Sequence, residues 1–296
     1  DKVELEEAYL LTMPDSNLPS GLNIKAGRAF WTLGYLNEHH AHADDFADRP
    51  LPYRAYLNKA FNDDGLEVTY ILPTDYYVEI GGGIFRGDDF PLGGADGENY
   101  GAWSSFARIG GDIDINQNWR LGAYILSGKA PGGRKSNEDA ITFTGDSDLY
   151  ALDFRYSLAP TGNAREQELV IQTEYFVRDE DGTYNDTGSS TGDVIFNDDS
   201  HGWYVQSIYK FDTQYRIGAR YSELEAPSVP TGLVGSTLDS SGHDPNTLSV
   251  MADWTNSEFS RIRLQYNENK LNITTDDRQI ILQYTMSYGA HSAHKY

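Results

Sequence analysis

Apolar and polar residues alternate with a period of two along much of this 296-residue chain. Over 203–211 the odd positions carry mainly Trp, Val, Tyr and Phe, and the same alternation runs through 215–222, 261–266 and 280–288. A helix would repeat its apolar positions every three or four residues, so these segments predict β-strands that each bury one face.

The alternation rule predicts about 13 strands. They begin near Val3, Leu22, Leu66, Tyr76, Trp103, Trp119, Asp148, Leu169, Gly202, Tyr215, Leu248, Phe259 and Ile280. Strand parity adds an expectation about the start of the chain. A bacterial membrane barrel has an even number of strands and both termini in the periplasm, so either at least one strand is expected ahead of Asp1 or the first strand is misread.

The connectors between these strands fall into two classes. Short ones at 73–75, 116–118, 212–214 and 256–258 alternate with long, Gly/Asp/Ser-rich ones near 34–63, 87–101, 130–147, 179–201 and 224–247. Short turns at one end and long loops at the other are typical of an outer-membrane barrel, with periplasmic turns and extracellular loops. Five aromatic residues next to the short turns fit an interfacial girdle, although strand propensity alone also favours aromatics. They are Tyr76, Trp119, Tyr215, Trp254 and Phe259.

Composition narrows the function classes. The 45 acidic and 23 basic residues give a formal net charge of −22, which disfavours nucleic acid as a partner. The absence of cysteine excludes disulfides, thiolate zinc sites and cysteine nucleophiles. No P-loop, H-E-x-x-H or nucleophile-elbow pattern occurs, so we expect no enzyme.

These patterns together predict an all-β fold. We expect residues 1–296 to form a single domain, a transmembrane antiparallel β-barrel of the outer-membrane type with about 14–16 strands. A soluble β-architecture is the alternative. The expected location is the cell outer membrane, and the expected partners are its lipid and lipopolysaccharide. Homo-oligomerisation is left open by the sequence.

Several motifs resemble a known family. The C-terminal residues 289–296 read GAHSAHKY, residues 37–54 read NEHHAHADDFADRPLPYR, and residues 85–91 read FRGDDFP. Together with LNIKAGRAF at 22–30, they resemble the zinc-regulated outer-membrane proteins, which are porin-like barrels. The KAGRAF strand is also similar to phosphate-selective porins. The resemblance implies a metal-linked transport role and further sequence ahead of the strand at 4–9.

A His- and Asp-rich stretch in the first long loop is the strongest local signal for ligand binding. Its candidate metal ligands are Glu38, His39, His40, His42, Asp44 and Asp45. Imidazole and carboxylate groups suit zinc and related divalent cations, and His40 and His42 project to the same side of an extended chain. A polar surface loop is the alternative. No cofactor is required, and zinc or another divalent cation is the ligand that these residue types fit.

The charged positions of the strands are expected to face the lumen, because a lipid-facing charge costs about 2–4 kcal/mol at the bilayer midplane. The predicted pore-lining residues are Glu79, Arg108, Asp112, Arg120, Arg155, Glu174, Lys210, Arg216, Arg220, Asp253, Arg261 and Arg263, with Lys25 and Asp153 on the same face. Both signs are present, as in a water-filled pore; a salt-bridged plug is the alternative.

The long loops 87–101, 179–201 and 224–247 are acidic and contain no Lys or Arg. Such loops concentrate cations at a pore mouth. The leading functional hypothesis is therefore a porin-like channel for a small solute, with divalent-cation uptake, zinc above all, as its specific form. The alternatives are a non-conducting receptor or scaffold and an anion-selective porin.

Overall fold

The structure is a computed structural model that describes residues 5–13, 18–88, 90–93, 101–135, 141–186, 192–225, 227–236, 238–257 and 259–286. Within these ranges, no helix has the length and apolar character needed to cross a membrane.

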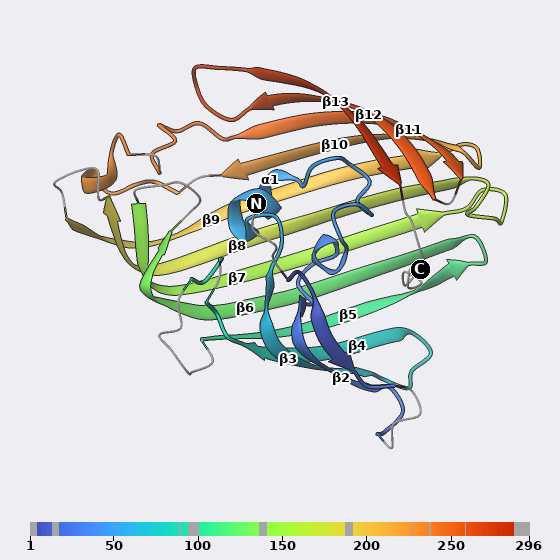
Figure 1. Ribbon diagram of the computed structural model, residues 1–296, viewed down its shortest axis with the longest axis horizontal. Helices are drawn as coiled ribbons and strands as arrows, with labels where there is room; N and C mark the ends of the chain where they lie inside the picture. The colour runs from blue at the N-terminus through green and yellow to red at the C-terminus, as the bar shows by residue number, and fades with distance from the viewer. Residues whose placement is uncertain are drawn as a thin grey trace.

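Thirteen antiparallel strands form one sheet, and every strand pairs with its neighbours in the chain (Figure 1). The strands are β1 (Ala8–Leu11), β2 (Leu22–Phe30), β3 (Asn62–Ile71), β4 (Tyr77–Phe85), β5 (Ala102–Asp114), β6 (Gln117–Lys135), β7 (Ile141–Leu158), β8 (Glu168–Asp186), β9 (Asp193–Lys210), β10 (Tyr215–Glu225), β11 (Asn246–Ser257), β12 (Ser260–Lys270) and β13 (Asp277–Met286). The sheet curls strongly, so that β1 and β13 are its two ends.

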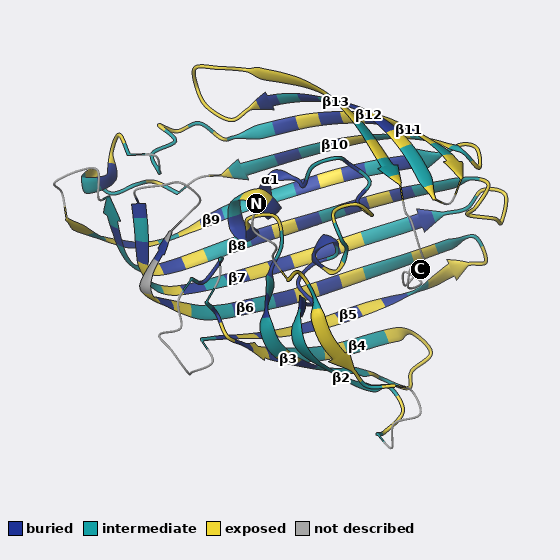
Figure 2. Ribbon diagram, in the orientation of Figure 1, coloured by how far each residue is buried: buried dark blue, intermediate teal, exposed yellow. Residues whose placement is uncertain are grey.

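The two faces of the sheet differ in chemistry. Leu152, Ile217 and Leu264 are among the large apolar side chains exposed on the outer face, whereas Asp153 and Arg263, each 3% exposed or less, are buried on the inner face. Figure 2 shows this alternation as stripes of buried and exposed residues along each strand. Apolar outside and polar inside is the pattern of a transmembrane β-barrel wall, so the predicted fold class is confirmed.

The strand predictions hold in number and position for the other strands; β1 begins at Ala8, and the predicted start near Val3 lies outside the described residues. Two predicted long loops are wrong. Most of 130–147 and 179–201 extends β6, β7, β8 and β9, which reach 18 or 19 residues. Their apolar residues pack together: Phe143, Tyr184 and Phe196 form a buried cluster with Leu233. Gly and Asp made these stretches look like loops, although Ile141 and Phe143 kept the strand period.

We call the two ends of the wall the short-turn end and the long-loop end. The short-turn end carries the connectors 72–76, 115–116 and 211–214, and the long-loop end carries 31–61, 86–101 and 226–245. The predicted segregation of short and long connectors holds for these connectors, whereas the nine-residue connector 159–167, also at the short-turn end, departs from it.

Residues 31–61, which we call the inner segment, run from β2 to β3 along the inner face of the sheet (Figure 1). The segment contains the 3-10 helix η1 (Leu36–Glu38) and the helix α1 (Leu51–Leu57), and a second 3-10 helix, η2 (Thr231–Leu233), precedes β11. Helix α1 begins after Pro50 and ends at Asn58, whose left-handed conformation closes the last turn. It packs on β9 so closely that a Cβ at Gly202 would lie 2.9 Å from the Tyr56 ring.

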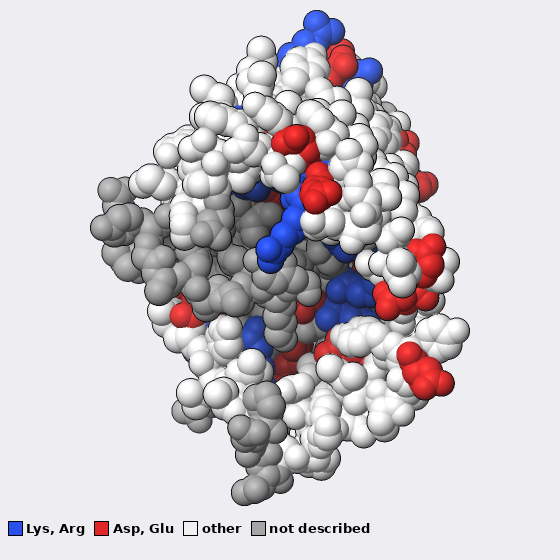
Figure 3. All heavy atoms as spheres, turned by 90° about the vertical axis from the view of Figure 1, so that its right-hand side faces the viewer, with Lys and Arg blue, Asp and Glu red and all other residues white. Residues whose placement is uncertain are grey.

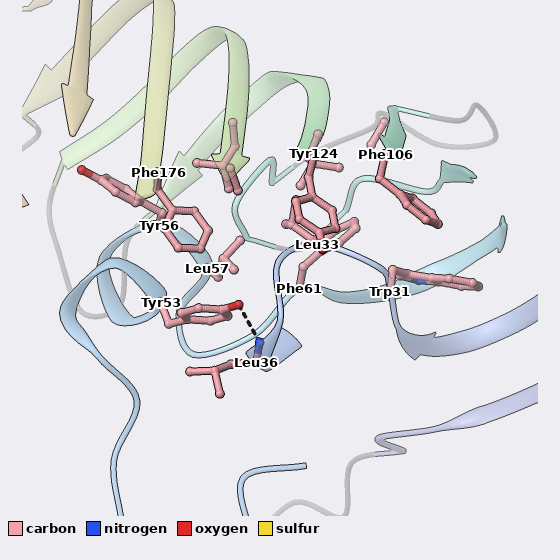
Figure 4. Close-up of a cluster of buried hydrophobic side chains, with 14 of the residues drawn as sticks. Trp31, Leu33, Leu36, Tyr53, Tyr56, Leu57, Phe61, Phe106, Tyr124 and Phe176 are labelled. Atoms are coloured by element: carbon pink, nitrogen blue, oxygen red, sulfur yellow. Dashed lines mark hydrogen bonds between the residues drawn. The ribbon is translucent and has the colours of Figure 1, made fainter. Parts of the chain in front are cut away.

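The main hydrophobic core lies between the inner segment and the wall (Figure 4). Trp31 and Leu57 are fully buried in it and pack with Phe85 and Phe176 from the strands. A 31-residue polar loop would leave this surface in water, so burial of these side chains holds the segment inside the curved sheet.

Candidate functional site

The inner face of the wall carries charged residues opposite one another on neighbouring strands. Glu79 pairs in register with Arg108, and Asp253 with both Arg216 and Arg263, whereas Arg120 lies opposite Arg155 and contacts Asp153 instead, at 3.2 Å. The Arg263 Nε donates to Asp253 at 2.8 Å, and Arg108 contacts Glu79 at 3.3 Å. Opposite charges placed directly across a strand pair stabilise the sheet and neutralise much of the lumenal charge.

The predicted pore-lining residues occupy three environments. Arg108, Glu174, Arg220, Asp253 and Arg263 are buried, mostly beneath the inner segment; Glu79, Arg120, Arg155, Lys210, Arg216 and Arg261 are half-buried; and Asp112 is exposed near the short-turn end. The inner segment therefore separates several of these residues from open lumen.

Three carboxylates of the inner segment are held by arginines of the wall. Glu38 pairs with Arg108 of β5, and Asp45 accepts a hydrogen bond from Arg216 Nη1 of β10 at 2.8 Å. Glu38 and Asp45 were among the predicted metal ligands, but each is paired with an arginine of the wall; the third carboxylate, Asp48, was not predicted.

Asp48 makes the densest of these attachments. Its Oδ1 accepts from Arg220 at 2.6 Å and from Gln265 at 2.7 Å, and its Oδ2 accepts from Asn267 at 3.0 Å. Burial opposes ionisation, yet Arg220 and the hydrogen bond from Gln265 hold the pKa of this carboxyl below its ordinary value. One aspartate thus ties the segment to β10 and β12.

Asp44, another predicted metal ligand, is also paired with an arginine. Its Oδ2 accepts a hydrogen bond from Arg49 Nε at 2.6 Å, and both side chains are at most 6% exposed. Arg49 in turn donates to the carbonyl oxygens of Leu36 and His39, so the pair closes the backbone of the segment on itself.

The three predicted histidine ligands have separate partners. His39 Nδ1 lies 2.9 Å from the Tyr35 carbonyl, and His40 Nε2 lies 2.9 Å from a Glu7 carboxylate oxygen. His40 and His42 stack with ring centroids 5.4 Å apart, so they do share one side of the chain. Nevertheless, the described part of the chain holds no group of three or more His, Asp or Glu side chains arranged to bind a metal ion.

Burial lowers the pKa of His39 below its ordinary value, since an imidazolium would lose its hydration there, and Arg49 and Arg120 add to the effect. His39 is therefore neutral at physiological pH and donates its Nδ1–H to Tyr35.

Glu174 lies at the centre of a buried hydrogen-bond cluster. Its two carboxylate oxygens accept from the hydroxyls of Tyr53 and Tyr204, each at 2.7 Å, and from the backbone N–H of Tyr35 at 3.1 Å. Gly34 has a φ of +72°, and any Cβ there would lie 2.4 Å from Glu174 Oε2. Glu174 therefore anchors the segment instead of facing open water.

Sequence reasoning missed Asp48, Gln265, Asn267 and Glu67 as anchors of the inner segment. Glu67, 3% exposed, accepts from the backbone N–H and hydroxyl of Thr32. The sequence did hold one signal for them. In β3 and β12 polar residues alternate with apolar ones, which assigns the polar residues to the inner face but does not show which residues they contact.

Comparison with known proteins adds little to this geometry. No family model matches the sequence. An uncharacterized protein of Aquifex aeolicus (strain VF5) is 26% identical over 319 residues, and the alignment covers 100% of this chain but 64% of that protein. The chain thus spans less than two thirds of the length of this relative.

Among solved structures, the chain is similar to outer-membrane proteins of Pseudomonas. The toluene transporter TodX of Pseudomonas putida matches with a TM-score of 0.36 and 9% identity, over 77% of this chain and 74% of that one. OccD3 (OpdP) of Pseudomonas aeruginosa matches with a TM-score of 0.38 and 12% identity, over 90% and 74%. Because these TM-scores are below 0.5, the likeness carries no argument about what this chain does.

Proposed function

We propose that this chain forms the wall and the constriction of an outer-membrane, porin-like channel for a small polar solute. The single observation that carries the proposal is the alternation of exposed apolar side chains, such as Leu152, with buried charged ones, such as Asp153, around a curled antiparallel sheet. Lipid solvates the first set, and only a polar interior solvates the second.

The position of the inner segment favours a narrow, selective channel instead of a wide, open pore. It lies against β5, β8, β10 and β12 through Arg108, Glu174, Arg220 and Arg263, and so occupies much of the space inside the sheet. A solute that passes it must be small and must exchange its hydration for contacts with charged side chains.

The proposal also implies which molecules surround the outer face of the wall. Lipid would cover the apolar band. Lipopolysaccharide would surround the extended ends of β7, β8 and β9, where Asp148 lies opposite Asp179 and Asp179 lies opposite Asp199.

Planar-bilayer recording on the purified chain tests the proposal. We expect discrete conductance steps that increase when residues 38–48 are replaced by a Gly/Ser linker of equal length, because the linker lacks the anchors Glu38, Asp45 and Asp48. The matched control replaces the exposed connector 271–276 in the same way and should leave the conductance unchanged. No conductance at any voltage from protein that is inserted and folded would favour the non-conducting alternative.

Zinc uptake is a second candidate, supported by one specific contact. His40 and His42 stack together beside Glu7, which supplies imidazole and carboxylate donors within one small region. Zinc titration of the wild type and of the triple variant H39A/H40A/H42A tests it, with His243→Ala as the control because His243 is half-buried elsewhere and contacts the Lys270 carbonyl. Equal zinc affinity in the wild type and the triple variant would remove zinc from the proposal.

A further inference from the structure

A pocket of about 340 Å³ opens inside the wall at the short-turn end. Its lining comes from β9, β10, β11, β12 and β13 and from the tip of the inner segment at His42 and Ala43. Figure 3 faces this end and shows Lys and Arg side chains gathered within the central hollow.

The charge of this pocket is opposite to that of the chain. Lys210, Arg216 and Arg261 line it, and its described lining contains no Asp or Glu, although the chain carries a net charge of −22. Hydroxyl groups complete the polar surface, among them those of Thr255, Ser257 and Thr285. Cations together with neutral hydroxyl donors form the donor set that surrounds a bound oxyanion.

Two of the cations retain unused hydrogen-bonding capacity. Lys210 makes no ion pair or hydrogen bond with any described residue. Glu168 lies opposite it on β8, but its carboxylate is beyond ion-pair distance and accepts a hydrogen bond from Ser157 at 2.8 Å. Arg261 donates Nη2 to the His42 carbonyl at 2.7 Å, and its guanidinium makes no other hydrogen bond within the described part of the chain.

Arg216 differs, because Asp45 and Asp253 already hold it. It contributes to the positive potential of the pocket but has little net charge left for an incoming ligand. Lys210 and Arg261 are therefore the residues on which binding should depend.

We propose that this pocket binds a small oxyanion, a carboxylate or phosphate group, between Lys210 and Arg261. The anion would give Lys210 an ion-pair partner at contact distance and accept a hydrogen bond from the Arg261 guanidinium, while the hydroxyls satisfy its remaining oxygens. As a stage in permeation the site rests on the proposed channel, but binding itself does not require conduction.

Isothermal titration of the refolded full chain with inorganic phosphate, and separately with succinate, tests the inference. We expect saturable binding of at least one of them with a stoichiometry of one, weakened about tenfold or more in Lys210→Gln and in Arg261→Gln. Lys210→Arg should retain binding within a few-fold, because it keeps the charge. Heat-modifiable migration in detergent gels verifies that each variant is folded.

Arg155→Gln is the matched control. It removes one lumenal cation that stacks near Tyr35 and does not line the pocket, so it should change affinity less than twofold. Absence of saturable binding to the folded wild type overturns the inference, as does an equal loss of affinity in Arg155→Gln. Binding without conductance would refute the channel and leave this site standing, whereas conductance without binding would do the reverse.

Discussion

Asp45 of the inner segment and Arg216 of β10 lie 171 residues apart in sequence and form an ion pair of 2.8 Å inside the wall. Arg216 also contacts Asp253 of β11, so removal of Asp45 leaves the arginine with one partner instead of two. The Asp45–Arg216 pair thus fixes the inner segment to the wall, and without it the wall keeps the Arg216–Asp253 pair.

Asp45→Asn should loosen the tip of the inner segment without unfolding the barrel. The pair is about three quarters buried, so we expect its loss to cost about 1–2 kcal/mol locally. Hydrogen–deuterium exchange of peptides covering 39–48 should become faster in the variant. Asp146→Asn, which breaks the exposed pair with Lys129, is the control and should leave those peptides unchanged.

Tyr53→Phe should destabilise the protein by about 1–3 kcal/mol. The Tyr53 hydroxyl donates to Glu174 and accepts the Leu36 backbone N–H at 3.0 Å, and both groups are buried, so the variant weakens two hydrogen bonds at once (Figure 4). Urea unfolding in detergent measures the change. Tyr150→Phe on the outer face should cost about 0.5 kcal/mol or less, since that ring is 42% exposed; equal costs for the two variants would contradict the anchoring role.

Leu264→Arg tests the lipid-facing band. Leu264 lies in the middle of β12 and is 53% exposed on the outer face. An arginine there should destabilise the protein folded in vesicles by about 2–4 kcal/mol. Ile195→Arg, on the extension of β9 at 78% exposure, should cost about 0–1 kcal/mol, because we expect this extension to lie beyond the hydrocarbon region of the membrane. Similar costs at both positions would argue against a membrane band.

His39 should make stability depend on pH in one direction. Its pKa is lowered in the folded state, so the unfolded chain binds more protons below its ordinary value of 6.5, and the stabilisation is lost as pH falls through that value. The melting temperature of the wild type should therefore fall more between pH 7.5 and 5 than that of His39→Gln. Parallel profiles for the two proteins would show that His39 is not buried as the structure has it.

The period-two alternation predicted the strands and their inner faces because each strand decides its own two faces. Residues such as Asp153 and Leu152 differ in burial for a local reason that the sequence displays directly. The connectors were harder. Ile141 and Phe143 keep the strand period inside a stretch whose Gly and Asp content is typical of a loop, so the two local signals conflict there.

Nothing local indicated that residues 31–61 enter the sheet. The partners of Asp48 are Arg220, Gln265 and Asn267, which lie more than 170 residues away. An acidic, His-rich stretch looks the same whether it meets a metal or a set of distant arginines, so the sequence identified the residues but not their partners. The Lys210–Arg261 pocket was missed for the same reason, since five strands contribute to it.

The attachment of the inner segment at both ends has a mechanical consequence. Phe30 directly precedes the inner segment and Asn62 directly follows it, and these two residues pair with each other across β2 and β3. Both ends of the inner segment are therefore attached at one position of the sheet. Displacement of the segment from the lumen would break its ion pairs and apolar contacts but would leave the hydrogen bonds between all the strands of the wall intact.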